Sequence, residues 1–304
     1  MDKLQAMSVF VQIAERGSLT AAAAATGKSL PSVVRILANL EDALQARLLN
    51  RTTRRLSLTE EGRLYLQNCR RILAELDDAE AALGQQQKTP SGLISVTTPV
   101  RFGELHAAPA INSYLQRFPS VRVRLLLLDR TIDMLEEGID IAIRIAPLTD
   151  SSLIAKPIGQ IREVTCASPA LLQRCGLPER PEALSELPCV RFTGLSTASP
   201  WQFADRGKPL NVSIDGPLTC NQVNASIQAC VGGLGFGRFL CYQAMPAVQR
   251  GELKIVLQDF EPKPIPLSLV FLENRLLSTR IRTFVDWMAK ALPESLAVAA
   301  KVPH

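Results

Sequence analysis

Three polar residues, Ser32, Arg35 and Asn39, recur three and then four positions apart among apolar neighbours. At 3.6 residues per turn, this spacing puts them on one face of a helix. A hydroxyl, a guanidinium and a carboxamide are groups that hydrogen-bond to the base edges and phosphates of nucleic acid. Upstream, Ser29 is a natural N-cap, and Pro31 is tolerated in the first turn of the helix.

A second polar group lies farther along the chain, between two short β-like runs. It comprises Arg51, Thr52, Thr53, Arg54 and Arg55. Three arginines around the tip of a hairpin would suit contacts with a phosphate backbone. Residues 1–58 hold eight Lys/Arg and four Asp/Glu, so the positive charge is concentrated here although the whole chain is only +5. The alternative is an ordinary solvated turn.

Two shorter helical patterns precede the polar face. The first has apolar residues at helical spacing before a natural stop at Gly17, namely Leu4, Met7, Phe10, Val11 and Ala14. The second is an alanine-rich helix, Thr20–Thr26, which Ser18 would cap and Gly27 would end. The third helix turns a different set of residues inward: Val33, Ile36, Leu37, Leu40 and Leu44. This layout predicts a winged helix-turn-helix, the alternative being a three-helix bundle without that function.

Residues 1–59 resemble the DNA-binding domain of LysR-type transcriptional regulators. The resembling residues are Phe10, 17–22, 29–35, Leu40, Glu41, Leu44, Leu48, Leu49, Arg51, Leu58, Thr59 and Gly62. Leu30 and Val34 depart from the polar residues common in that family. We therefore expect double-stranded DNA to be contacted by Ser29, Pro31, Ser32, Arg35, Asn39, Arg51, Thr52, Thr53, Arg54 and Arg55.

A long helix is expected next, in a linker over residues 59–88, with Thr59 as its cap and Glu60 and Glu61 near its positive end. An apolar seam follows at heptad spacing: Tyr65, Cys69, Ile72, Leu76, Ala79 and Leu83. In the LysR-type family this helix pairs with its copy, which implies a homodimer or homotetramer. A single helix packed on its own domain would show the same pattern.

From residue 93 onward, strand-like and helix-like runs alternate, which predicts parallel α/β sheets. The expected elements include strands at 93–98, 121–129 and 140–145, and helices at 102–118 and 132–137. Five stretches, 136–145, 150–155, 167–169, 232–237 and 282–286, resemble the LysR-type effector domain, a two-lobed α/β clamp like periplasmic binding proteins. The resemblance implies an effector domain over 93–300, with lobe I at 93–162 and 267–300 and lobe II at 163–266.

Ligands of open α/β sheets bind past the carboxyl ends of strands. That rule selects Thr98, Pro99, Val100 and Arg101 after the first strand. Candidates from elsewhere in the domain are Thr149, Thr193 and Asn221. Hydroxyls, a helix N-terminus and an arginine would suit a carboxylate, so a small organic acid is the expected effector. The alternative makes Thr98 a helix cap and Arg101 a surface residue.

Other chemistry has little support in the sequence. The glycines of 232–237 follow a helix and precede a strand, so they fit a turn better than a nucleotide loop. Seven scattered cysteines and two histidines, His106 and His304, suggest neither a disulfide framework nor a metal site, and no cofactor is expected. We expect a cytoplasmic protein without a membrane partner and without catalytic activity. The alternative is a cytosolic α/β solute-binding protein or enzyme whose N-terminal helices only mediate assembly.

Overall fold

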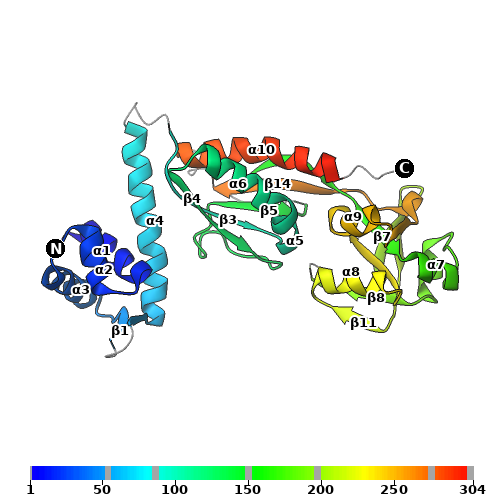
Figure 1. The fold of residues 1–304 in the computed structure, drawn as a ribbon, viewed down its shortest axis with the longest axis horizontal. Coiled ribbons are helices and arrows are strands. Elements are labelled where there is room, and N and C mark those ends of the chain that lie inside the picture. The colour runs from blue at the N-terminus through cyan, green and yellow to red at the C-terminus, as the bar shows by residue number, and fades with distance from the viewer. Residues whose placement is uncertain are drawn as a thin grey trace. The chain divides into compact units, whose positions relative to one another are not determined.

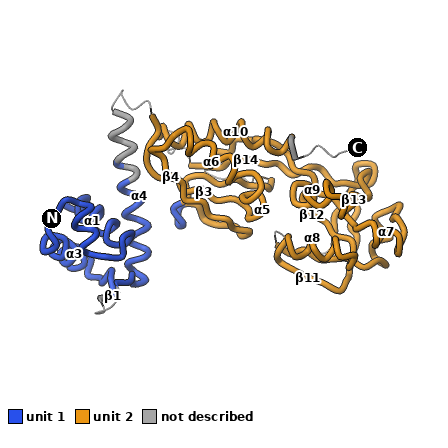
Figure 2. The backbone as a smooth tube through the Cα atoms, in the orientation of Figure 1, with its two compact units in different colours: residues 1–88, 135–138 blue, residues 89–134, 139–304 orange. Residues whose placement is uncertain are grey.

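The computed structural model describes residues 2–51, 56–83, 89–147, 153–194, 200–272 and 278–299. Figure 1 shows the order of the elements. The chain forms two compact units, one made of residues 1–88 with 135–138 and the other of 89–134 with 139–304 (Figure 2). Each unit is described below by itself.

Three helices open the first unit: α1 (Lys3–Arg16), α2 (Leu19–Thr26) and α3 (Leu30–Leu44). The caps expected from the sequence are confirmed, since the Ser18 and Ser29 side chains accept hydrogen bonds from Ala21 N and Ser32 N. Gly27 ends α2 in the left-handed region at φ 64°, where a β-carbon would be strained. Each boundary of this trihelical unit is therefore set by a local signal.

The core of the first unit lies between these helices and includes Phe10, Ile13, Val33, Leu37 and Leu40, all almost completely buried. The predicted apolar face of α1 needs one correction. Leu4 is 40 % exposed, whereas Ala6, Val9 and Ile13 are buried in its place. The buried face of α1 is therefore shifted around the helix from the expected one, because Ala6, Val9 and Ile13 form a buried stripe.

An antiparallel hairpin follows, formed by β1 (Leu49–Arg51) and β2 (Leu56–Leu58), with Leu49 opposite Leu58. This confirms the predicted wing. Its tip, residues 52–55, lies outside the described residues. Buried Glu41 of α3 holds the start of the wing, because its Oε1 accepts hydrogen bonds from Leu48 N at 2.9 Å and Leu49 N at 3.3 Å.

The long helix α4 (Glu60–Leu83) begins where Thr59 Oγ1 accepts a hydrogen bond from Gly62 N at 2.9 Å. Its predicted seam divides into two parts. Cys69 is fully buried in the core of the first unit, and Tyr65 and Ile72 pack against that core. The alternative of self-packing therefore holds for this half. The side chains of Ala79 and Leu83 and the hinge at 84–88 lie outside the described residues.

The second unit contains two five-stranded sheets. The first has the order β4-β3-β5-β14-β6. Its strands are β3 (Gly92–Thr98), β4 (Val121–Leu127), β5 (Ile141–Ile145), β6 (Leu153–Ile161) and β14 (Ile265–Leu272). Strand β3 runs parallel to β4 and β5, whereas β14 is antiparallel to β5 and β6. The prediction of parallel sheets holds for β4, β3 and β5 and needs correction at β14, which returns from the second sheet and is antiparallel to its neighbours.

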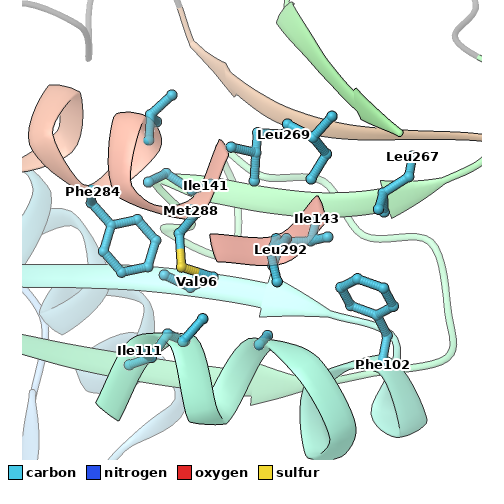
Figure 3. Packing of buried hydrophobic residues seen from close by; sticks show 14 of the residues in the cluster. Val96, Phe102, Ile111, Ile141, Ile143, Leu267, Leu269, Phe284, Met288 and Leu292 are labelled. Atoms are coloured by element: carbon cyan, nitrogen blue, oxygen red, sulfur yellow. The ribbon is translucent and has the colours of Figure 1, made fainter. Parts of the chain in front are cut away.

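A helical stretch follows β3 without interruption: α5 (Val100–Phe102), a π-helical turn η1 (Gly103–Ala107) and α6 (Ala108–Arg117). It packs with the C-terminal helix α10 (Thr279–Ala299) on the sheet. Figure 3 shows Ile111 of α6, Phe284 and Met288 of α10, and Val96 and Ile141 of the strands in this core. Burial of this apolar layer fixes the helix start at the end of β3.

The second sheet has the order β11-β8-β12-β7-β13. Its strands are β7 (Glu163–Ala167), β8 (Cys189–Phe192), β11 (Leu218–Cys220), β12 (Phe236–Leu240) and β13 (Lys254–Val256). Helices α7 (Pro169–Cys175), α8 (Val223–Val231) and α9 (Cys241–Gln249) accompany it, as does the hairpin of β9 (Trp201–Asp205) and β10 (Lys208–Val212). The glycines of 232–237 join α8 to β12, as predicted.

Several predicted elements of this unit need correction. Residues 132–137 form no helix; Ile132 and Met134 instead pack in a small cluster with Ala142 and Val270. Strand β6, the hairpin β9–β10 and helix α9 were not expected. In the described part of the chain, no helix is long and apolar enough to cross a membrane.

Candidate DNA-binding face and ligand site

The outer face of α3 carries the residues selected from the sequence. Arg35 and Asn39 are exposed, and Ser32 is half-buried, opposite the buried Val33, Leu37 and Leu40. Their spacing along a well-ended helix leaves a guanidinium and a carboxamide accessible from the same side. Such a face presents donors and acceptors suited to base edges and phosphates.

The start of α3 adds Ser29 and Pro31, both exposed, to this face. Ser29 Oγ is engaged as the helix cap. The two positions that depart from the polar pattern differ from each other, since Leu30 is 41 % exposed and Val34 is half-buried. Leu30 therefore offers an apolar contact surface beside the polar one, of the kind that fits a thymine methyl.

The wing arginines are described only in part. Arg51 belongs to β1 by its backbone. Thr52, Thr53, Arg54 and Arg55 lie outside the described residues. The sequence did not single out Glu41 as a positioning group, although a glutamate within the apolar stripe of α3 was a usable signal. Arg47, 77 % exposed, forms an ion pair with Glu41 at 3.5 Å.

The second candidate site lies where β3 and β4 end side by side. Leu128 N donates to Thr98 O at 3.0 Å, so the parallel pairing continues past the strands. One turn on, Val100 N donates to Asp129 Oδ1 at 3.0 Å. The structure thus brings Thr98, Pro99, Val100 and Arg101 together with Asp129, a residue that sequence reasoning missed.

The polar groups here are unequally satisfied. Thr98 is 2 % exposed, and its Oγ1 has no hydrogen-bond partner among the described residues. The alternative in which Thr98 caps the helix is wrong, because the N-cap position is Pro99 and the Thr98 side chain makes no capping hydrogen bond. Arg101 donates to Glu104 Oε2 at 3.0 Å, while its Nε is buried without a partner.

An aromatic cluster adjoins this strand end. Phe102, His106 and Tyr242 have ring centroids 5.1 to 5.6 Å apart. Tyr242 belongs to α9, which follows the carboxyl end of β12 in the second sheet. Burial lowers the pKa of His106 to about 4, and its Nδ1 lies 2.8 Å from Ser295 Oγ of α10. The imidazole is therefore neutral at neutral pH and packed in the core of this unit.

The remaining predicted ligand residues lie elsewhere. Thr193 follows β8 and bonds through its backbone N–H to Cys220 O at 2.9 Å, so Thr193 and the exposed Asn221 are neighbours at one end of the second sheet. No contact reported for the described residues joins them to Thr98–Arg101. Thr149 lies outside the described residues.

The remaining candidates for chemistry are the potential metal ligands and the cysteine thiols. Across the described ranges, no three His, Cys, Asp or Glu side chains are grouped so as to hold a metal ion. All seven cysteines are free. Burial raises the pKa of Cys69 to about 11 and of Cys189 and Cys230 to about 12, so these thiols are protonated at neutral pH and poorly nucleophilic.

Two sequence profiles match the chain. One describes a bacterial regulatory helix-turn-helix protein of the lysR family and covers residues 4–63. The other describes a LysR substrate binding domain and covers residues 87–293. Together they span both units.

Curated relatives match over nearly their whole length. The uncharacterized HTH-type transcriptional regulator YhjC of Escherichia coli is 33% identical, covering 97% of this chain and 100% of the relative. An HTH-type transcriptional repressor of Pseudomonas aeruginosa is 32% identical, covering 97% and 94%. The HTH-type transcriptional activator AaeR of Escherichia coli is 30% identical, covering 94% and 93%.

Solved structures show the same architecture. CrgA of Neisseria meningitidis, a LysR-type transcriptional regulator, matches with a TM-score of 0.61 and 31% identity, over 95% of this chain and 98% of that one. The full-length virulence activator AphB of Vibrio cholerae matches with a TM-score of 0.60 and 26% identity, over 94% and 98%.

Proposed function

The chain belongs to the LysR-type family of helix-turn-helix transcriptional regulators, and from that premise we propose which of its residues meet DNA, which meet the effector and how it assembles. Regulators of this family bind DNA through the helix-turn-helix and small molecules through the substrate-binding domain. The chain is thus a regulator and not an enzyme, and the assembly-only alternative for its N-terminal helices is set aside.

The proposed DNA contacts are centred on α3. Arg35 and Asn39 read base edges or phosphates from their exposed positions, with Ser29, Pro31 and Ser32 at the start of the same helix. The wing supplies backbone contacts through Arg51, Thr52, Thr53, Arg54 and Arg55. The observation that carries this proposal is the accessible polar face of α3 over a fully buried opposite face.

The proposed effector site is centred on Thr98–Arg101 at the ends of β3 and β4. Its support is the buried Thr98 hydroxyl and Arg101 Nε, which have no hydrogen-bond partner among the described residues and lie at the end of the parallel pair β3–β4. Thr149, Thr193 and Asn221 remain proposed members. The organic acid expected from the sequence would use Arg101 and the helix N-terminus, where Arg101 already donates to Glu104 and Val100 N to Asp129.

The proposed organisation follows the fold. Residues 1–58 bind DNA, residues 59–88 form the linker, and residues 93–300 bind the effector. The chain passes from lobe I to lobe II near residue 163 and returns near residue 266. We expect a homodimer through the outer part of α4, with a homotetramer as the larger form. Leu76 is half-buried and not part of the cluster that takes Cys69, which leaves Leu76 for a partner helix. Because it acts on DNA, we place it in the cytoplasm.

A gel shift with the full-length protein tests the DNA assignment. The probe is the DNA upstream of its own gene, at two salt concentrations. Affinity should fall steeply with salt, because phosphate contacts release counterions. Arg35→Ala should weaken binding roughly 5- to 100-fold and relax base preference. Arg117→Ala, an exposed arginine of the second unit, is the matched control and should bind normally. Unchanged binding and preference in Arg35→Ala would refute the assignment of α3.

A further inference from the structure

The helix that follows β3 has an acceptor already seated at its start. The helix runs from Val100 through Arg117, and its N-cap Pro99 offers no side-chain hydrogen bond. The first free N–H, that of Val100, donates instead to Asp129 Oδ1 at 3.0 Å. A helix N-terminus attracts anions because its N–H groups and its dipole point outward. Here the chain's own carboxylate takes the place of an anionic ligand.

Asp129 reaches this place by topology. It comes two residues after β4 ends at Leu127, and β4 pairs in parallel with β3, Leu127 lying opposite Thr98. The end of β4 is therefore beside the start of the helix, and a carboxylate there meets Val100 N without any change of backbone. The cap is non-local, but the sheet register fixes it.

One predicted cation of the site is engaged elsewhere. Arg101 forms an ion pair with Glu104 at 3.0 Å. Within the described ranges, Asp129 itself has no ion pair. The charge of Asp129 also acts on Tyr242. Burial is the main cause that raises the pKa of the Tyr242 hydroxyl, and Asp129 adds to this rise, whereas Gln243 and Arg101 oppose it.

The site therefore combines a carboxylate that has no ion pair among the described residues with a buried hydroxyl. Thr98 Oγ1 is unpartnered at 2 % exposure, one residue before the N-cap. Tyr242 is buried against Phe102, with ring centroids 5.2 Å apart, so neither ring offers a face to a ligand. An incoming carboxylate would meet the charge of Asp129, and the Val100 N–H is already taken. An ammonium group would gain an ion pair with Asp129.

We propose that Asp129 sets the charge selectivity of the effector site, so that the effector presents a protonated amine to Asp129 and not a carboxylate to the helix N-terminus. The inference rests on the proposed effector site at the ends of β3 and β4. It replaces the organic acid by a cationic amine as the ligand class, and makes Asp129 the residue that decides between them.

The test uses two probes of the same ring and opposite charge, benzylammonium and benzoate, titrated into the full-length protein. The reporter is the backbone amide resonance of Val100 in protein labelled with ¹⁵N-valine, because that N–H is the group in dispute. Three proteins are compared: wild type, Asp129→Asn and Asp129→Ala. Asparagine keeps an acceptor for Val100 without the charge, whereas alanine opens the helix start.

In wild type we expect benzylammonium to shift the Val100 resonance with an affinity at least about tenfold higher than that of benzoate, equivalent to about 1.4 kcal/mol. Asp129→Asn should lose the preference for the amine, and Asp129→Ala should favour benzoate. If Asp129→Ala does not fold, the loss of preference in Asp129→Asn still decides the matter.

Benzoate binding to wild type as well as to Asp129→Ala would overturn the proposal, as would the absence of any Val100 shift with either probe in all three proteins. A gel shift without ligand separates this failure from that of the proposed function. Retained operator binding would leave the regulator assignment standing while the charge selectivity falls. Absence of operator binding in wild type would refute the DNA assignment whatever the probes do.

Discussion

Helices α3 and α5 both begin at a proposed binding surface, yet their starts are built differently. Helix α3 is capped by Ser29, the residue directly before it, and its first turn is exposed. Helix α5 is capped by Asp129, which comes from the end of another strand. The first cap is local and leaves the surface of the helix open to DNA. The second depends on the whole sheet and fills the site with a charge of the protein's own.

The largest expected effect would break the simple form of this comparison, because the wing of the first unit is also held by a residue from another element, Glu41 of α3. Glu41→Ala leaves the buried N–H groups of Leu48 and Leu49 without their acceptor. We expect the unit to lose about 3 kcal/mol, since each buried donor left unpaired costs roughly 1–3 kcal/mol. Hydrogen exchange of the α3 amides in the full chain should accelerate about a hundredfold.

Glu41→Gln is the matched control for that prediction. It keeps an oxygen for the two N–H groups and loses only the charge, so its exchange rates should lie much closer to those of wild type. Equal acceleration in both variants would mean that the ion pair with Arg47, and not the acceptor, holds the wing.

The next effect concerns the helical stretch begun by α5 and appears as a pH dependence. Burial lowers the pKa of His106 to about 4, against about 6.5 when unfolded. Between these values the unfolded chain binds more protons, so the contribution is complete above pH 6.5 and is lost as the pH falls towards 4. We expect the free energy of unfolding to fall by about 2 kcal/mol at pH 5, as measured by urea unfolding with tryptophan fluorescence.

In His106→Gln this part of the pH dependence should disappear, leaving only what the carboxylates contribute to both proteins. Parallel stability curves for wild type and variant between pH 6.5 and 4 would show that the imidazole is not kept neutral by the core.

A smaller effect sharpens the contrast at α3. Ser29→Ala removes the side-chain acceptor for Ser32 N, at an expected cost of about 1 kcal/mol to the helix start. Ser29→Asp keeps an acceptor and should restore most of it. The measurement is hydrogen exchange at the first turn of α3. If alanine and aspartate behave alike there, the cap does not stabilise this helix.

The smallest effect concerns Leu30. Because the side chain is 41 % exposed, Leu30→Ala should change folding stability by less than about 0.5 kcal/mol. If the side chain touches a thymine methyl, affinity should fall severalfold for sites that carry that base and stay unchanged for sites that lack it. Equal losses on both kinds of site would assign Leu30 to non-specific contact.

The contrast between local and distant caps also explains what the sequence could predict. Ser18, Ser29, Gly27 and Thr59 act on their immediate neighbours, and each was placed correctly from residue type and spacing. Asp129 was missed because its role exists only once β4 lies beside β3. Thr193 was placed after a strand correctly, whereas Asn221, expected at the start of a helix, follows β11, and α8 begins at Val223. Spacing along the chain says nothing of which strand ends meet.

Other misses have identifiable signals. Helix α9, with Tyr242, contains Pro246, a residue that argues against a helix unless its neighbours tolerate the missing N–H. The hairpin β9–β10 turns at Arg206 and Gly207, both at positive φ, and that glycine was a usable turn signal. The seam of α4 is different in kind, because an apolar stripe has the same spacing whether it meets its own domain or another chain.

The division of the α4 seam has a mechanical consequence for the first unit. Leu66 and Cys69 are interior residues of the first unit, so α4 is a fourth member of its core and not a tether attached to it. A fragment stopped at residue 58 would lack part of its own interior. Since the same unbroken helix runs on to Leu83, a torque applied at its far end is borne by the packing around Phe10 and Tyr65, whose rings lie 5.8 Å apart. The first half of the helix is therefore fixed in the core of the unit that carries α3, so a change in the direction of α4 would disturb that core.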